Sequence, residues 1–253
     1  MTDLSERIQV EVCVGSVADV AVAVAEGADR VELCGGLELG GLTPSVGLVE
    51  TVLAERSLPM VVMLRPRAGG FCYDRGEFAA MLRDARRLLD LGARGVAFGL
   101  LDRQRRIDAS RSREVVELAA PLPAVFHRAF DFASDRSAAL DALIEIGCTR
   151  VLTSGGQPTA EAGVAELGDL IRRAAGRIEI MPGGGITAEN VASIVRETGC
   201  RQVHIGASAP RDDGSLGSEG GSIELCDRRY FEGARFRAVA ADALAATISA
   251  IGR

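Results

Sequence analysis

The chain has 253 residues, of which 47% are hydrophobic and 25% charged, a balance typical of globular proteins rather than disordered or membrane-spanning ones. Its formal net charge of -6, without a cluster of basic residues, argues against a nucleic-acid partner. The N-terminus carries no secretory signal and no apolar run approaches the ~20 residues needed to cross a bilayer, so we expect a cytoplasmic protein with no membrane partner.

Eight short apolar runs alternate with helical patterns, at roughly one unit per 30 residues. This order is typical of a parallel sheet covered by helices, and the chain length is near that of an eight-fold barrel. The sequence therefore predicts an α/β fold, a single (β/α)₈ TIM barrel that spans residues 1–253 as one domain. We place the strands near residues 8–14, 29–34, 59–65, 94–99, 123–128, 149–154, 177–182 and 201–206.

A repeated pattern of Gly, a small residue, two polar-tolerant positions and Val begins every even-numbered strand. It reads GADRV, GARGV, GCTRV and GCRQV at residues 27–31, 92–96, 147–151 and 199–203. Glycine suits the left-handed residue that ends a helix. A two-unit period of this kind favours a closed barrel over an open sheet.

All 29 basic residues are arginine, because the sequence contains no lysine. This excludes Schiff-base, pyridoxal and lysine-base mechanisms, since a guanidinium group keeps its proton. Six cysteines without paired close spacings indicate reduced thiols rather than a disulfide framework in a chain of this size.

The first two strands share the pattern Glu, apolar, Cys, which gives Glu11 with Cys13 and Glu32 with Cys34. Because side chains alternate along a strand, each Glu lies on the same face as its Cys, and the four groups can converge. Carboxylates inside a barrel are costly unless paired or protonated, which makes both candidate catalytic residues. The alternatives are an internal ion pair with an arginine such as Arg65, and simple packing of the thiols.

Both histidines fall at strand ends. His127 precedes Arg128 and Asp131, a trio that can supply a general acid or base, an anion clamp and an orienting carboxylate. A structural polar network is the alternative. His204 stands alone on the eighth strand, and we expect a hydrogen-bonded barrel histidine rather than a catalyst.

The third strand ends in LRPRAGG, where Arg65 and Arg67 flank a proline. Guanidinium groups bind carboxylate or phosphate bidentately, so we expect Arg65 to act at the site and Arg67 to bind an anion. Solvation at the surface is the alternative, more so for Arg67.

Glycine-rich segments follow the seventh and eighth strands, MPGGGIT at 181–187 and IGAS at 205–208. In barrels these two loops frequently bind phosphate through backbone N–H groups and a helix N-terminus. We therefore predict an anion site at Gly184, Gly185, Gly206 and Ala207, with Thr187 capping the following helix. The stretch 207–234, rich in Gly, Ser and charge, is typical of a functional lid or a partly disordered loop.

These segments together resemble the CutC family, whose members are described as copper homeostasis proteins. The similarity rests on residues 11–49, the LRPR turn, FHRAFD at 126–131, VLTSGG at 151–156 and MPGGGI at 181–186. The resemblance implies a TIM barrel, a cytoplasmic setting, homo-oligomers and Cu(I) association through Cys13 and Cys34. The chain departs from the family at residues 68–70, where Ala-Gly-Gly lacks an acid often present, and after the eighth strand.

Two functions follow as hypotheses. The first is copper homeostasis with Cu(I), a possible cofactor or cargo, held by the thiolates of Cys13 and Cys34, since soft ligands select Cu(I). The alternative is a TIM-barrel enzyme acting on a small anionic or phosphorylated metabolite at the C-terminal face. Its candidate catalytic residues are Glu11, Glu32, Arg65, His127 and Asp131, and its candidate anion-binding residues are Arg67, Arg128, Ser154, Gly184, Gly185, Gly206 and Ala207.

Overall fold

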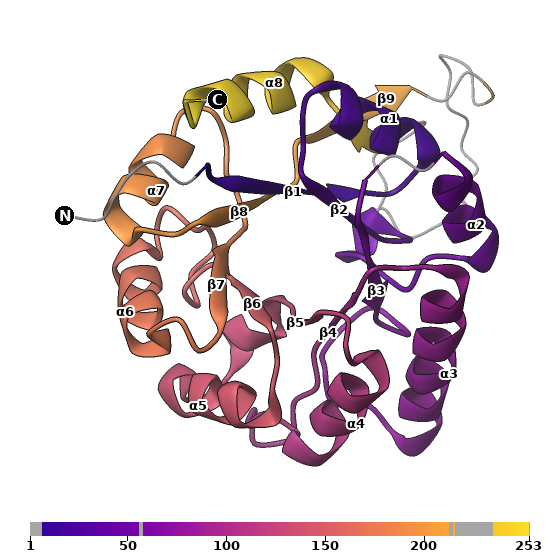
Figure 1. Ribbon diagram of the computed structural model, residues 1–253, viewed down its shortest axis with the longest axis vertical. Coiled ribbons are helices and arrows are strands. Elements are labelled where there is room, and N and C mark those ends of the chain that lie inside the picture. Colours follow the sequence, from indigo (N-terminus) through magenta and orange to yellow (C-terminus); the bar gives the residue numbers. More distant parts are fainter. Residues whose placement is uncertain (1–6, 56–57, 213–214, 216–234, 253) are drawn as a thin grey trace, which may run out of the picture.

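Eight parallel strands form a ring in the computed structural model, with helices around the outside (Figure 1). The structure describes residues 7–55, 58–212, 215 and 235–252. The predicted TIM barrel is confirmed, and each predicted strand contains the observed one. The strands are β1 (Gln9–Val14), β2 (Arg30–Leu33), β3 (Met60–Leu64), β4 (Val96–Phe98), β5 (Ala124–Phe126), β6 (Arg150–Thr153), β7 (Glu179–Pro182) and β8 (Gln202–Ile205).

The ring closes because β1, the first strand, pairs with β2 on one side and with β8, the last strand of the ring, on the other. In register, Glu11 faces Arg30 of β2 on one side and His204 of β8 on the other. Strands β7 and β8 meet at a single parallel bridge between Gly183 and His204. Residues nearly 200 positions apart in the chain therefore become neighbours on the inner wall of the barrel.

Helices begin and end where the local sequence offers capping groups. Gly92 and Gly147, from the repeated pattern, end α3 and α5 with φ values of 118° and 90°, the left-handed region that favours glycine. The helices are α1 (Val17–Ala25), α2 (Val46–Ala54), α3 (Arg75–Leu91), α4 (Ala109–Ala119), α5 (Arg136–Ile146), α6 (Val164–Ala174), α7 (Val191–Thr198) and α8 (Ala241–Ala250), with short 3-10 helices η1 (Leu37–Leu39) and η2 (Arg128–Phe132).

Alternation along the strands divides the core into two layers. Outward side chains such as Val10, Val12 and Val62 pack against the helices. The inward set includes a small apolar cluster inside the barrel, made of Cys34, Val61, Met63, Ala97, Val125, Leu152 and Met181. The same inward face carries the polar residues of β1, β2 and β8, which is what positions the candidate site.

The stretch 207–234 does not begin as the irregular loop that we expected. Strand β9 (Ser208–Asp212) follows β8 almost directly and pairs antiparallel with β10 (Arg235–Val239). The N–H of Val239 donates to the carboxylate of Asp19 at 2.7 Å, which ties this hairpin to α1. Residues 213–214 and 216–234 lie outside the described residues. No helix of the described ranges is long and apolar enough to cross a membrane.

Candidate functional site

Two cysteines meet at the inner wall of the barrel. Cys13 lies on β1, opposite Glu32 in the register of β2, and Cys34 directly follows β2. Their Sγ atoms are 3.9 Å apart, and the Cys34 Sγ also lies 3.7 Å from the Glu32 carboxylate. Cys34 is buried and Cys13 half-buried. The duplicated Glu-apolar-Cys pattern thus brings both thiols and one carboxyl group into a single cluster.

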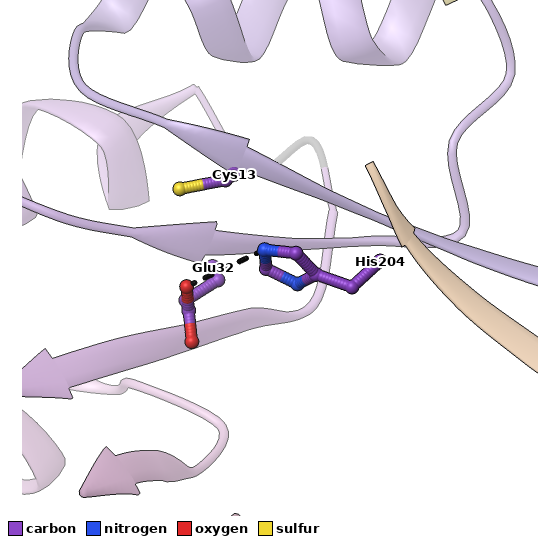
Figure 2. A group of neighbouring side chains, drawn as sticks. All are labelled: Cys13, Glu32 and His204. Atoms are coloured by element: carbon purple, nitrogen blue, oxygen red, sulfur yellow. Dashed lines mark ion pairs between the residues drawn. The ribbon is translucent and has the colours of Figure 1, made fainter. Parts of the chain in front are cut away.

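His204 reaches into the same cluster from β8. Its Nδ1 lies 2.8 Å from Glu11, and its Nε2 lies 3.8 Å from Glu32. Figure 2 shows Cys13, Glu32 and His204 converging from three adjacent strands. One ligand atom from each of the three lies within 4.8 Å of the other two. These residues, with Cys34, form what we call the thiol cluster.

Glu11 binds both His204 and an arginine. Its carboxylate pairs with Nε of Arg30, whose NH2 donates to the Gln202 side chain at 2.7 Å. The internal ion pair considered as an alternative from the sequence therefore exists, but its partner is Arg30 rather than Arg65. Because Glu11 is fully buried and bonded on both sides, it orients His204.

Mutual electrostatics divide the cluster into charged and neutral members. The hydrogen bond from Cys34 lowers the pKa of the Cys13 thiol to about 5, whereas that bond and burial raise the pKa of Cys34. Burial raises the pKa of Glu32 to about 8. Burial opposes ionisation of Glu11 too, but the hydrogen bond and charge of His204 lower its pKa to about 2. At neutral pH the cluster holds a Cys13 thiolate beside a protonated Glu32.

The His204 ring carries the balancing charge. Burial favours its neutral form, but the neighbouring Glu32, Cys13 and Glu11 outweigh burial and raise its pKa well above the ordinary value. A thiolate beside an imidazolium that a carboxylate orients is an arrangement that activates cysteine nucleophiles. Thiolate and imidazole are also the ligands that soft and borderline metal ions prefer.

The terminal nitrogens of Arg65 bind backbone carbonyls, and the anion binding predicted for this residue stays a prediction. NH1 donates to the carbonyls of Leu39 and Gly41 at 2.8 and 3.0 Å, and NH2 donates to that of Gly69 at 2.8 Å. Its Cζ lies 5.4 Å from the centre of the Phe71 ring. Only Nε remains without a partner within the described ranges.

Arg67 is also engaged inside the chain. Its Nε and NH2 bind the carboxylate of Glu77 on α3, and NH1 donates to the Gly70 carbonyl at 3.0 Å. Arg67 therefore binds a carboxylate, but this carboxylate belongs to a side chain of the same protein.

Asp131 binds Arg128 and Ser154 in a polar network, and the catalytic and anion-binding roles predicted for the trio stay predictions. The Asp131 carboxylate accepts from Arg128 Nε at 2.8 Å and from the Ser154 N–H at 3.0 Å. Arg128 NH2 donates in turn to Ser154 Oγ at 2.8 Å. The His127 Nδ1 instead accepts from the N–H of Ala129 at 3.1 Å.

The glycine loop after β7 packs against this arginine. A Cβ on Gly184 would lie 3.0 Å from an Arg128 nitrogen, so the absent side chain makes room for the guanidinium group. The anion site predicted at Gly184 and its neighbours Gly185, Gly206 and Ala207 stays a prediction.

The predicted cap at Thr187 is wrong. Helix α7 begins at Val191, and Asn190 precedes it. The Thr187 N–H donates to the Asn190 side chain at 2.9 Å, and the Asn190 Nδ2 donates to the Gly185 carbonyl at 2.9 Å. The Asn190 side chain thus bridges the backbone of Gly185 and Thr187, and α7 begins only after it, at Val191.

The hydrogen bond expected for His204 is present, to Glu11, but its place in the thiol cluster was not predicted. Its signal was present, because a closed barrel places the eighth strand beside the first, and alternation puts His204 on the inner face with Gln202. Once β8 is paired with β1, the contact between His204 and Glu11 follows.

The chain matches the CutC family model over residues 8–209. It is 45% identical over 210 residues to the CutC family protein of Treponema denticola, covering 83% of this chain and 85% of that protein. It is 43% identical over 197 residues to the one from Xanthomonas axonopodis pv. citri, covering 78% and 82%.

Solved structures indicate the same family. The CutC protein of Streptococcus agalactiae, named as a proposed copper homeostasis protein, matches with a TM-score of 0.74 and 35% identity, covering 78% of this chain and 97% of that one. A phosphoribosylanthranilate isomerase from Thermotoga maritima, at 14% identity and a TM-score of 0.57 over 97% of this chain and 98% of its own, shares the fold alone. The sequence resemblance is thus confirmed, and the chain belongs to the CutC family.

Proposed function

We propose that this CutC protein takes part in copper homeostasis by binding Cu(I) as cargo between Cys13 and Cys34. The observation that carries the proposal is the 3.9 Å separation of the two sulfurs. Metal–thiolate bonds are about 2.3 Å long in comparable zinc sites, so one ion can contact both sulfurs without moving either strand. The Streptococcus agalactiae relative, named in connection with copper, supports the choice of metal.

The residues around the sulfurs fit a soft cation. Thiolates select Cu(I), and His204 supplies an imidazole within the same group of ligand atoms. Cys34 and His204 both hold protons at neutral pH, because the pKa of each is raised. A bound cation displaces such protons, so Cu(I) affinity rises with pH.

An anaerobic competition titration against a chromogenic Cu(I) chelator tests the proposal. The Cys13→Ser, Cys34→Ser double variant should lose more than about 100-fold in affinity, beyond the loss typical for an outer contact. The matched control is Cys72→Ser, which removes an exposed thiol in the turn after β3. Equal affinity of the double variant and the control contradicts the proposal. The sixth cysteine, Cys226, lies outside the described residues and stays unchanged in all variants.

An enzyme acting on a small anionic or phosphorylated metabolite is the second candidate. The observation that favours it is the order Glu11, His204, Cys13, in which a carboxylate orients an imidazolium beside a thiolate. Turnover of a metabolite panel that Cys13→Ser abolishes and Cys72→Ser preserves supports this function, and no turnover in the wild type counts against it.

The cytoplasmic location and homo-oligomeric state expected from the sequence belong to the same proposal. Cell fractionation tests the location, and light scattering of the purified protein tests the assembly.

A further inference from the structure

Two neighbouring side chains at the C-terminal end of the barrel each bury an N–H group without an acceptor. Arg65 directly follows β3 and is 7% exposed, and His127 directly follows β5 and is 4% exposed. Neither Nε of Arg65 nor Nε2 of His127 has a hydrogen-bond partner among the residues that the structure describes. Buried polar groups in native proteins are nearly always satisfied, so both atoms call for an acceptor.

The hydrogen bond to His127 Nδ1 fixes which nitrogen donates. Because Nδ1 accepts from the Ala129 N–H at 3.1 Å, the proton of the neutral ring sits on Nε2. Burial and the nearby charge of Arg65 lower the pKa of His127 to about 3, so the ring is neutral at physiological pH. Nε2 is therefore an N–H donor.

Arg65 brings a buried positive charge that no carboxylate of the described residues neutralises. Its terminal nitrogens bind the carbonyls of Leu39, Gly41 and Gly69, and the ion pairs found within the described ranges do not include Arg65. Buried charges are normally paired. The guanidinium group thus offers one free N–H together with an uncompensated charge.

Phe71 lies against both groups. Its ring centre is 5.4 Å from the Arg65 Cζ and 5.3 Å from the centre of the His127 ring. Burial raises the pKa of Tyr73, and the charge of Arg65 and a hydrogen-bonding contact with its guanidinium group oppose that rise. The buried Tyr73 hydroxyl therefore lies against Arg65, although it forms no well-aligned hydrogen bond with the described residues.

We propose that Arg65 and His127 form a binding site for a small organic carboxylate. One uncompensated charge matches a monoanion better than a dianionic phosphate, and single N–H groups from two side chains can each meet one carboxylate oxygen. Phe71 supplies an apolar surface for the remainder of the ligand. This site uses none of the residues of the thiol cluster, so it does not depend on the proposed copper function.

Side-chain NMR of the copper-free, ¹⁵N-labelled protein tests the site with acetate and lactate as probes. Titration to roughly 50 mM, a range suited to ligands this small, should shift the Arg65 Nε–H and His127 Nε2–H signals. The Arg67 Nε–H signal should stay in place, because that group already binds Glu77. Absence of any shift at Arg65 and His127 overturns the proposal, as does a response to inorganic phosphate but not to carboxylates.

Variants separate this site from its surroundings. His127→Asn keeps an oxygen for the Ala129 N–H while removing the Nε2 donor, and it should weaken lactate binding about tenfold or more. Arg67→Gln is the matched control and should bind like the wild type. The Cys13→Ser, Cys34→Ser double variant should also retain lactate binding, so failure of the copper proposal leaves this one standing. Unchanged lactate affinity in His127→Asn overturns it.

Discussion

Replacement of Glu11 by Gln tests how the barrel interior is held together. Glu11 is 1% exposed and binds Arg30 on one side and His204 on the other, both of them charged. Glutamine keeps the shape of the side chain but removes the negative charge. Loss of one partner from a buried ion pair typically costs about 3–5 kcal/mol, because the remaining charge stays buried and unpaired.

The pKa of Glu11 gives an independent magnitude. It falls from the ordinary 4.5 to about 2 on folding. At about 1.4 kcal/mol per pH unit, this corresponds to about 3 kcal/mol of stability at neutral pH. Because the folded pKa is depressed, this stability is fully present above pH 4.5 and is lost as the pH falls toward 2.

Urea unfolding of the wild type and Glu11→Gln at several pH values measures both quantities. At pH 7 the variant should unfold with a free energy lower by about 3 kcal/mol, and the difference should shrink below pH 4.5. Asp141→Asn is the matched control, because its pair with Arg173 is exposed on both sides, and its midpoint should match the wild type. Equal stability of Glu11→Gln and the wild type at pH 7 would refute an ionised, paired Glu11.

Three further outcomes are expected. Alkylation of Cys13 by iodoacetamide, followed by mass spectrometry, should have a midpoint near pH 5, and Cys34→Ala should move it upward by removing the hydrogen bond that lowers the Cys13 pKa. Gly184→Ala should lower the thermal midpoint, at a cost of about 1–2 kcal/mol, since its φ is 103°, whereas Gly206→Ala, with open space around its Cβ position, should not. The folded pKa of Glu32 is raised to about 8, so the contribution of Glu32 to stability falls as the pH rises from 4.5 to 8. Relative to the wild type, Glu32→Gln should gain stability in urea unfolding over this range, and a wild-type-minus-variant difference that does not change with pH would contradict it.

Local signals in the sequence were sufficient to predict the barrel. Apolar runs and helix-ending glycines mark each strand and helix locally. Eight alternating strand–helix units are typical of a closed ring of parallel strands. The approach of Cys13 to Cys34 was predictable for the same reason, since adjacent parallel strands repeat one pattern.

The parts that the sequence did not predict depend on distant or backbone partners. His204 meets Glu11 only through the closure of β8 on β1, a contact between the last and the first strand of the ring. Arg65 binds backbone carbonyls, and these carry no residue-specific signal. At Thr187 two good capping residues lie within one turn, and Asn190 takes the role because it can also bind the Gly185 carbonyl.

Barrel closure has a consequence for the order in which the thiol cluster forms during synthesis. The two thiols lie on β1 and directly after β2, whereas the imidazole belongs to the last strand of the ring. A growing chain therefore exposes Cys13 and Cys34 long before residue 204 leaves the ribosome. Until then, Glu11 lacks the His204 imidazole that it binds in the folded barrel. The complete ligand set exists only after β8 has joined β1, so its appearance reports that the whole ring has assembled.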